Sequence, residues 1–138
     1  HAGTLMKFKR QISLILFCLY IAAVAILCFT QGEQLPELPK TWFGLPSDKV
    51  AHALMFFPFT ILGYLSFTSE ENSTLQKIAV LAILIAVGCG MAYATESIQR
   101  MLGYRAYEIS DIKADMTGLG IGTFISILFI IFSIRKHE

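Results

Sequence analysis

The stretch SDKVAHALMFFPFTILGYLSF, at Ser47–Phe67, joins a short polar segment to a long apolar one. After Lys49 its only acidic or basic side chain is that of His52. A helix rises about 1.5 Å per residue, so about 20 residues cross the roughly 30 Å hydrocarbon layer of a membrane. The stretch therefore predicts a membrane-spanning helix that begins with an acid, a base and a histidine near one membrane surface.

Three other runs share this length and apolar character. Of the 138 residues, 55% are hydrophobic and 15% are charged, whereas soluble domains carry about 25% charged residues. The sequence predicts an all-α, polytopic membrane bundle of four transmembrane helices in a single domain, 6–138. The predicted helices cover about 11–30, 50–67, 77–98 and 116–134. The opening HAGTL, residues 1–5, reads as a cloning remnant.

The first run combines features of a signal peptide and of a membrane anchor. Basic residues at 7–10 precede an apolar segment with small residues at Ala23 and Ala25, as in a signal peptide. The apolar run continues to Phe29, however, which is long enough to span, so we interpret it as an uncleaved anchor. With four spans both chain ends lie on one side. The basic cluster predicts that this side is the cytoplasm, which gives an N-in, C-in topology.

The charge balance and the cysteines argue against other classes of protein. A net charge of +1 lacks the concentrated basic face that nucleic-acid binding needs. Cys18, Cys28 and Cys89 lie inside the apolar runs, so they are interpreted as packing residues rather than a disulfide framework. We expect membrane lipids or an amphiphilic small molecule as partners and no nucleic acid, and we leave a homo-oligomer open.

The alternating topology gathers the unusual polar residues at the outer end of the bundle. His52 follows Asp48 by four residues and Asp115 follows Asp111 by four, so each pair shares a helical face. Ionisable side chains within a span need a partner or a wet cleft. We expect these side chains to line one outward-facing pocket. The candidate ligand-binding residues are Asp48, Lys49, His52, Glu96, Gln99, Arg100, Arg105, Asp111 and Asp115.

Each of these features also has a purely structural interpretation. Asp48 is typical of a helix N-cap. Glu96 and Arg100, four residues apart, match an ordinary ion pair at a helix end. Asp111 and Asp115 fit a solvated loop before the fourth helix.

Small residues recur every four positions in the third and fourth runs, and such ladders let helices approach closely in lipid. They predict that these two helices are neighbours. One ladder is Ala82, Ala86, Gly90 and Ala94, with Gly88 and Ala92 leading along a second face to Glu96; the other is Ala114, Gly118, Gly122 and Ser126.

The residue types leave three chemistries open. Histidine and carboxylates together suit a divalent cation, but the HExxH and CxxC spacings are absent, so no metal ligand is assigned and the cofactor is left unknown. General acid–base catalysis would use His52, oriented by Asp48, together with Glu96. Recognition of a phosphate or carboxylate would use basic side chains such as Arg105.

The order DKVAH at 48–52, TESIQ at 95–99 and R-x5-D-x3-D-x2-G from Arg105 to Gly118 resembles the VanZ-like family. That family's pattern is Asp-Lys-x-x-His opening a helix, an acid and Glu-x-x-Gln ending the next, and an Arg-led loop running into Asp-x-x-x-Asn-x-x-Gly. The resemblance covers roughly residues 47–122. Thr95 and Asp115 depart from it, standing where an acid and Asn are usual. The matching residues are Asp48, Lys49, His52, Glu96, Gln99, Arg105, Asp111 and Gly118.

The resemblance implies a multi-pass protein of the bacterial inner (cytoplasmic) membrane, in a family linked to low-level resistance to the lipid-tailed glycopeptide teicoplanin. We expect the pocket to engage an amphiphile, whether a lipoglycopeptide, a phospholipid or a lipid-linked cell-wall precursor. One alternative is a membrane-embedded hydrolase or transferase acting on a lipid head group, with His52 and Glu96 as catalytic residues. Another is a structural subunit of a membrane complex. Whether the protein is an enzyme is left open.

Overall fold

The computed structural model describes residues 2–29, 41–103 and 109–136, apart from the side chains of Ala2 and Trp42. Its elements are α1 (Ala2–Phe29), β1 (Thr41–Trp42), β2 (Leu45–Pro46), α2 (Ser47–Phe67), α3 (Thr74–Met101) and α4 (Ile109–Lys136). Each of these four helices is long and apolar enough to cross a membrane. The predicted all-α bundle of four transmembrane helices is confirmed, and the N-in, C-in orientation stays a prediction.

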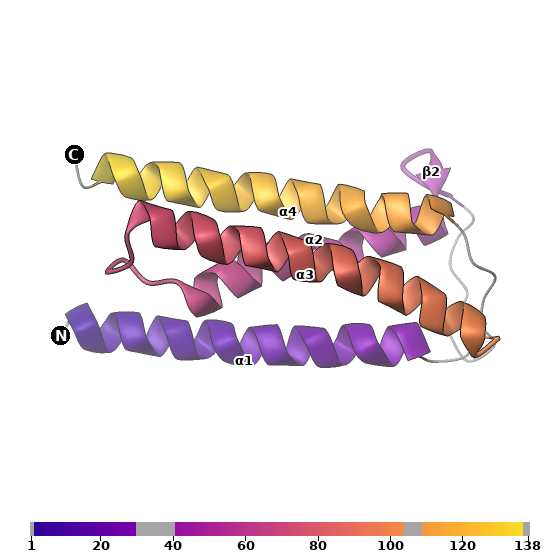
Figure 1. Ribbon diagram of the computed structural model, residues 1–138, viewed down its shortest axis with the longest axis horizontal. Helices are drawn as coiled ribbons and strands as arrows, with labels where there is room; N and C mark the ends of the chain where they lie inside the picture. The colour runs from indigo at the N-terminus through magenta and orange to yellow at the C-terminus, as the bar shows by residue number, and fades with distance from the viewer. Residues whose placement is uncertain (1, 30–40, 104–108, 137–138) are drawn as a thin grey trace.

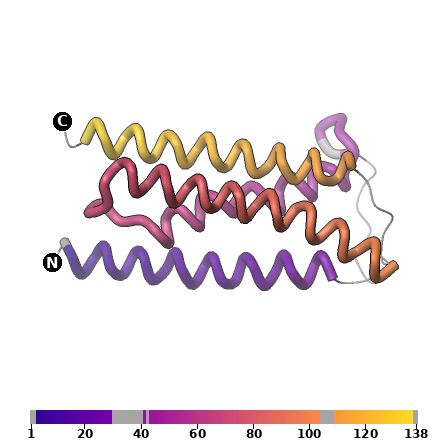
Figure 2. Tube along the Cα trace, in the orientation of Figure 1, coloured from indigo at the N-terminus to yellow at the C-terminus, as the bar shows by residue number. Residues whose placement is uncertain are grey.

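The helices lie side by side, and the two chain ends lie at the same end of the bundle (Figure 1). Helices α2 and α3 lie between α1 and α4, as the tube in Figure 2 also shows. Within the described ranges α2 packs against all three other helices, whereas no close backbone approach joins α1 to α4. The two outer helices are therefore held together through α2 and α3.

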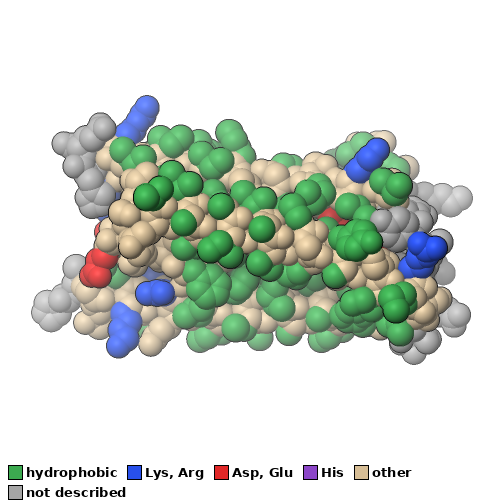
Figure 3. Space-filling model, viewed as in Figure 1, with side chains coloured by type: hydrophobic (Ala, Val, Ile, Leu, Met, Phe, Trp, Pro, Cys, Tyr) green, Lys and Arg blue, Asp and Glu red, His purple; other side chains and the backbone are tan. Residues whose placement is uncertain are grey.

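The surface of the bundle is apolar over its middle, and the Lys and Arg side chains gather toward its ends (Figure 3). Large apolar side chains such as Leu19, Ile83 and Phe124 are more than half exposed. Soluble monomers rarely expose a large continuous apolar patch. This surface fits a protein whose middle is covered by lipid tails.

The small residues of α4 face α2 rather than α3. This corrects the prediction that the two small-residue ladders of α3 and α4 meet each other. A Cβ placed on Gly118 would overlap the carbonyl oxygen of Ala53, and one on Gly122 would overlap that of Phe57 and lie 2.6 Å from Oγ1 of Thr60. Only residues without a side chain fit these positions, because the atoms opposite belong largely to the backbone of α2. The closest helix contact in the bundle is therefore that between α2 and α4.

Helix α3 packs through the second of its two small-residue faces. Gly88, Ala92 and Glu96 are buried on this face, and a Cβ on Gly88 would lie 2.7 Å from Cδ1 of Leu119 in α4. The prediction that α3 and α4 are neighbours is therefore confirmed, although through this face. The other ladder points outward, with Ala82, Ala86, Gly90 and Ala94 all exposed.

Helices α2 and α4 begin before the positions that hydropathy indicates. Asp111 and Asp115 consequently belong to the first turns of α4, not to a solvated loop as predicted. The unpaired amides of a helix N-terminus stabilise acidic side chains there, so polar residues extend the helix beyond the apolar run. The N-cap of α2 is Pro46 rather than Asp48, which lies in the first turn of the helix. Helix α1 likewise continues through residues 2–5.

Candidate functional site

A group of polar side chains lies where α2 and α4 begin and α3 ends, at the end of the bundle opposite the termini. We call it the polar cluster, and its members are Lys49, His52, Glu96, Gln99, Asp111 and Asp115. Apart from Lys49, each has at most 6% of its surface exposed. Ionisable side chains buried in a membrane bundle mark functional sites by default.

His52 lies between two carboxylates of α4. Its Nδ1 is 2.8 Å from Oδ1 of Asp115, and its Nε2 is 3.6 Å from Oδ2 of Asp111. One helical turn separates the two acids, and the close approach of α2 to α4 beside them brings both within reach of one ring. Asp115 therefore orients the imidazole, which corrects the role expected for Asp48.

Lys49 extends this network toward the surface. Its Nζ pairs with Oδ1 of Asp111 and lies 3.0 Å from Oδ2 of Asp48. Acid and base thus alternate from the exposed Asp48 to the buried pair of His52 and Asp115. Each charge faces one of opposite sign, which offsets the cost of removing it from water. The alternation explains how so many ionisable groups are tolerated in an apolar bundle.

Two buried acceptor atoms in the cluster, Oδ2 of Asp115 and Oε1 of Gln99, lack a hydrogen-bond partner in the described part of the chain. Gln99 uses its Nε2 to donate to the carbonyl oxygen of Cys28 at 2.6 Å, which ties the end of α1 to α3. Glu96, one turn earlier on α3, is 1% exposed and acts electrostatically on His52. Buried acceptors without donors indicate where a ligand or a water molecule donates.

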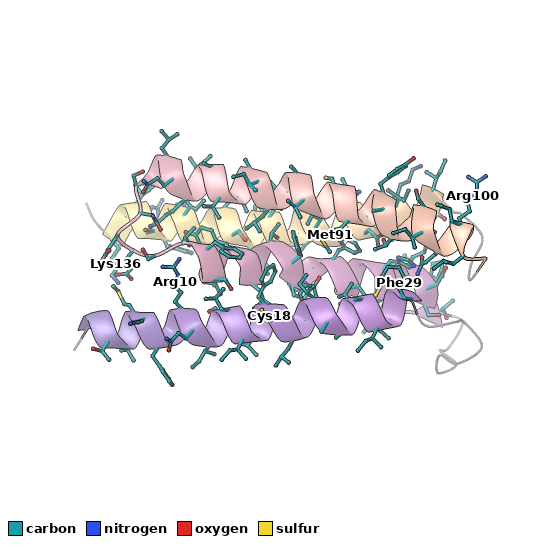
Figure 4. All side chains as sticks on the ribbon, turned by 60° about the horizontal axis from the view of Figure 1, so that its bottom comes forward. Arg10, Cys18, Phe29, Met91, Arg100 and Lys136 are labelled. Atoms are coloured by element: carbon teal, nitrogen blue, oxygen red, sulfur yellow. The ribbon has the colours of Figure 1, made fainter. Side chains whose placement is uncertain are left out.

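Two of the predicted site residues, Asp48 and Arg100, lie at the edge of the cluster or beyond it. The side chain of Asp48 is 61% exposed and forms its rim. Arg100 is exposed at the end of α3 and points away from the bundle (Figure 4). Arg105 lies outside the described residues, so its role in the site stays a prediction.

The carboxylates at the start of α4 are paired with basic side chains of α2. Among the residues that the structure describes, no group of three or more His, Cys, Asp or Glu side chains converges as metal ligands do. A divalent cation needs several oxygen ligands directed at one point. Here the carboxylates of Asp111 and Asp115 are directed at Lys49 and His52 instead.

The sequence did not single out Tyr20, whose hydroxyl donates to the carbonyl oxygen of Met55. This hydrogen bond holds α1 against α2 at Met55, about one helical turn after His52 in the sequence. A tyrosine inside an apolar run has no pattern that distinguishes such a role from ordinary packing, so sequence reasoning had no means to find it.

Comparison with known proteins identifies the family. The family model described as VanZ/LLP1 matches residues 8–131. An uncharacterized protein of Schizosaccharomyces pombe is 31% identical over 85 residues, which cover 60% of this chain and 48% of that protein. The match thus spans about half the length of that curated relative, and no solved structure matches the chain. Because the family match takes in parts of all four helices, the chain belongs to the VanZ/LLP1 family.

Proposed function

We propose that this protein binds the polar head group of an amphiphile at the polar cluster, while the lipid-exposed helices accommodate the acyl chains. The observation that carries the proposal is the buried pair of His52 and Asp115, which leaves Oδ2 of Asp115 as an acceptor without a partner among the described residues. A buried carboxylate with a free oxygen favours a ligand that donates hydrogen bonds. The cluster would face the outer side of a bacterial cytoplasmic membrane.

The chemistry of the cluster favours head groups with hydroxyl or ammonium donors. Oδ2 of Asp115 and Oε1 of Gln99 are both acceptors. Phospholipids with an amine, lipid-linked cell-wall precursors and lipoglycopeptides all carry such donors. A relative in a fungus, which builds no peptidoglycan, favours a phospholipid over a cell-wall precursor as the ligand. Capture of the lipid-tailed teicoplanin by the same cluster would give low-level resistance.

Lipid binding to the purified full chain tests the proposal. Asp115→Asn keeps the size of the side chain and removes its charge, whereas Asp48→Asn makes the same change at the exposed rim. Hydrogen bonds to charged groups contribute about 1.5–3 kcal/mol, so Asp115→Asn should weaken binding of phosphatidylethanolamine by at least roughly tenfold. Native mass spectrometry with phosphatidylethanolamine measures the retained lipid. Equal retention by folded wild type, Asp115→Asn and Asp48→Asn would count against the proposal.

A second candidate is a hydrolase or transferase acting on a lipid head group. The observation in its favour is the 2.8 Å contact between Nδ1 of His52 and Asp115, because a carboxylate that holds one ring nitrogen leaves the other to move a proton. Glu96 is the second catalytic candidate. In reconstituted vesicles, His52→Gln and Glu96→Gln would each abolish release of the head group while the protein stays folded. If the wild type releases no product from any phospholipid offered, the enzymatic candidate is rejected.

A further inference from the structure

A hollow lies at the other end of the bundle, near both termini. It has a volume of about 530 Å³ and is lined by α1, the α2–α3 turn and the end of α4. Cavities of about 300–1,000 Å³ are the usual size for small-molecule sites. We call it the basic cavity, because five of its lining side chains are basic and two are acidic. The residues at this end carry no motif that predicts such a feature.

Basic side chains enter this cavity from three helices. Lys7, Lys9 and Arg10 come from α1, Lys77 from α3 and Lys136 from α4. Figure 4 shows Arg10 extending from α1 toward the other helices, at the end of the bundle where Lys136 also lies. Convergence of like charges from separate helices costs energy unless an anion lies between them. The two acids of the cavity offset little of this repulsion between basic side chains. Glu70 pairs with Lys136 at 3.3 Å, and the side chains of Glu70 and Lys136 are both exposed.

Lys77 is the residue that points to a ligand. It is only 5% exposed, and its Nζ donates to the hydroxyl of Ser133 at 2.6 Å. No acidic side chain in the described part of the chain pairs with it, and an ammonium group has three donors. A buried charge is normally paired with a charge of opposite sign, and a neutral hydroxyl does not provide one. The cavity that Lys77 lines is therefore built for an anion.

Apolar side chains line another part of the cavity wall. Leu65, Phe129 and Phe132 line it beside the basic residues. The basic residues lie at the ends of the apolar helices, the depth at which lipid phosphates lie. An anion that reaches this position with an apolar tail attached satisfies both parts of the wall.

We propose that the basic cavity binds the phosphate of an anionic phospholipid, with its acyl chains lying against the apolar part of the cavity wall. Basic pockets between transmembrane helices recognise such head groups on the cytoplasmic side of membranes, which is the side that the positive-inside rule predicts for this end. The proposal does not depend on the polar cluster, which lies at the opposite end of the bundle.

Native mass spectrometry of the full chain in detergent tests this proposal. The probes are phosphatidylglycerol, phosphatidylcholine with the same acyl chains, and inorganic phosphate. Lys77→Gln removes the buried charge and keeps a donor for Ser133, and Arg10→Gln makes a second, partly exposed change in case the first variant fails to fold. The matched control is Lys113→Gln, which removes an exposed charge at the opposite end.

Lys77→Gln should retain about tenfold less phosphatidylglycerol and Arg10→Gln several-fold less, while Lys113→Gln matches the wild type. Equal phosphatidylglycerol retention by the wild type and both cavity variants would overturn the proposal. Equal retention of phosphatidylcholine, or equal stabilisation by inorganic phosphate at the same concentration, would do so as well.

Discussion

Replacing Gly118 with alanine tests whether the polar cluster depends on close contact between α2 and α4. Gly118 lies one turn after Asp115, and a Cβ there would overlap the carbonyl oxygen of Ala53, the residue that follows His52. The opposing atoms belong to the backbone, which cannot turn aside as a side chain does. The two helices must therefore separate, and the hydrogen bond between His52 and Asp115 must lengthen.

The expected loss of stability follows from three contributions. Overpacking costs about 1–3 kcal/mol, and loss of a hydrogen bond to a charged group costs about 1.5–3 kcal/mol. Alanine in place of glycine within a helix returns about 1 kcal/mol. The net loss is roughly 3 kcal/mol, which lowers Tm by about 6–12 °C for a chain of this size.

Gly120 provides the matched control on the same helix. It is exposed, and a Cβ there would have no neighbour within 4 Å, so Gly120→Ala should keep or slightly raise Tm. Thermal unfolding in detergent, followed by far-UV circular dichroism, compares the two variants. The nitrogen NMR shifts of the His52 ring report its hydrogen bond directly. If Gly118→Ala melts together with Gly120→Ala and leaves the His52 shifts unchanged, the coupling of helix contact to cluster geometry is refuted.

Two further substitutions probe the contacts around the cluster. Asp111→Asn removes the charge that Lys49 faces and should lower the free energy of unfolding by about 1.5–3 kcal/mol. The control Glu70→Gln, in the exposed pair with Lys136, should leave the free energy of unfolding unchanged. Denaturant titration in detergent measures both variants, and equal effects would contradict the buried network. Gln99→Leu removes the hydrogen bond to the carbonyl oxygen of Cys28 and should speed modification of the buried Cys28 thiol. The exposed Cys18 should react at the same rate as in the wild type. An unchanged modification rate of Cys28, measured by mass spectrometry, would show that Gln99 does not hold α1.

The spans were predictable from sequence because hydropathy reports burial in lipid directly. The placement of His52, Glu96 and Asp111 at one end of the bundle follows from topology, since every second connection between antiparallel helices lies at the same end. The start of α4 was not predictable in this way. Asp115 is polar and so counts against a span, yet it is helical because His52 supplies its partner from another helix. Hydropathy depends only on the residue types in a local segment, so it does not reflect a partner that is distant in sequence.

The packing faces and the basic cavity required coordinates for a different reason. Helices α3 and α4 both carry small-residue ladders, and spacing alone does not say which helix each ladder meets. Gly118 contacts α2, whereas Gly90 has no neighbour. The cavity is lined by residues from all four helices, and no local sequence pattern indicates that these residues come together. In the sequence Lys77 is only a charged residue just before an apolar run, and its burial became visible only in the fold.

Asp115 stands where the family resemblance leads us to expect asparagine, and this difference sets the charge of the polar cluster. His52 pairs here with a carboxylate, whereas an amide at this position would contribute no charge. With Asp115 present, the cluster contains three acidic side chains and two basic ones. An excess of charge of one sign attracts ligands with charge of the other sign. The basic cavity has the opposite excess. We therefore expect the two ends of one small bundle to select lipids by opposite head-group charge, an ammonium group at the polar cluster and an anionic phosphate at the basic cavity.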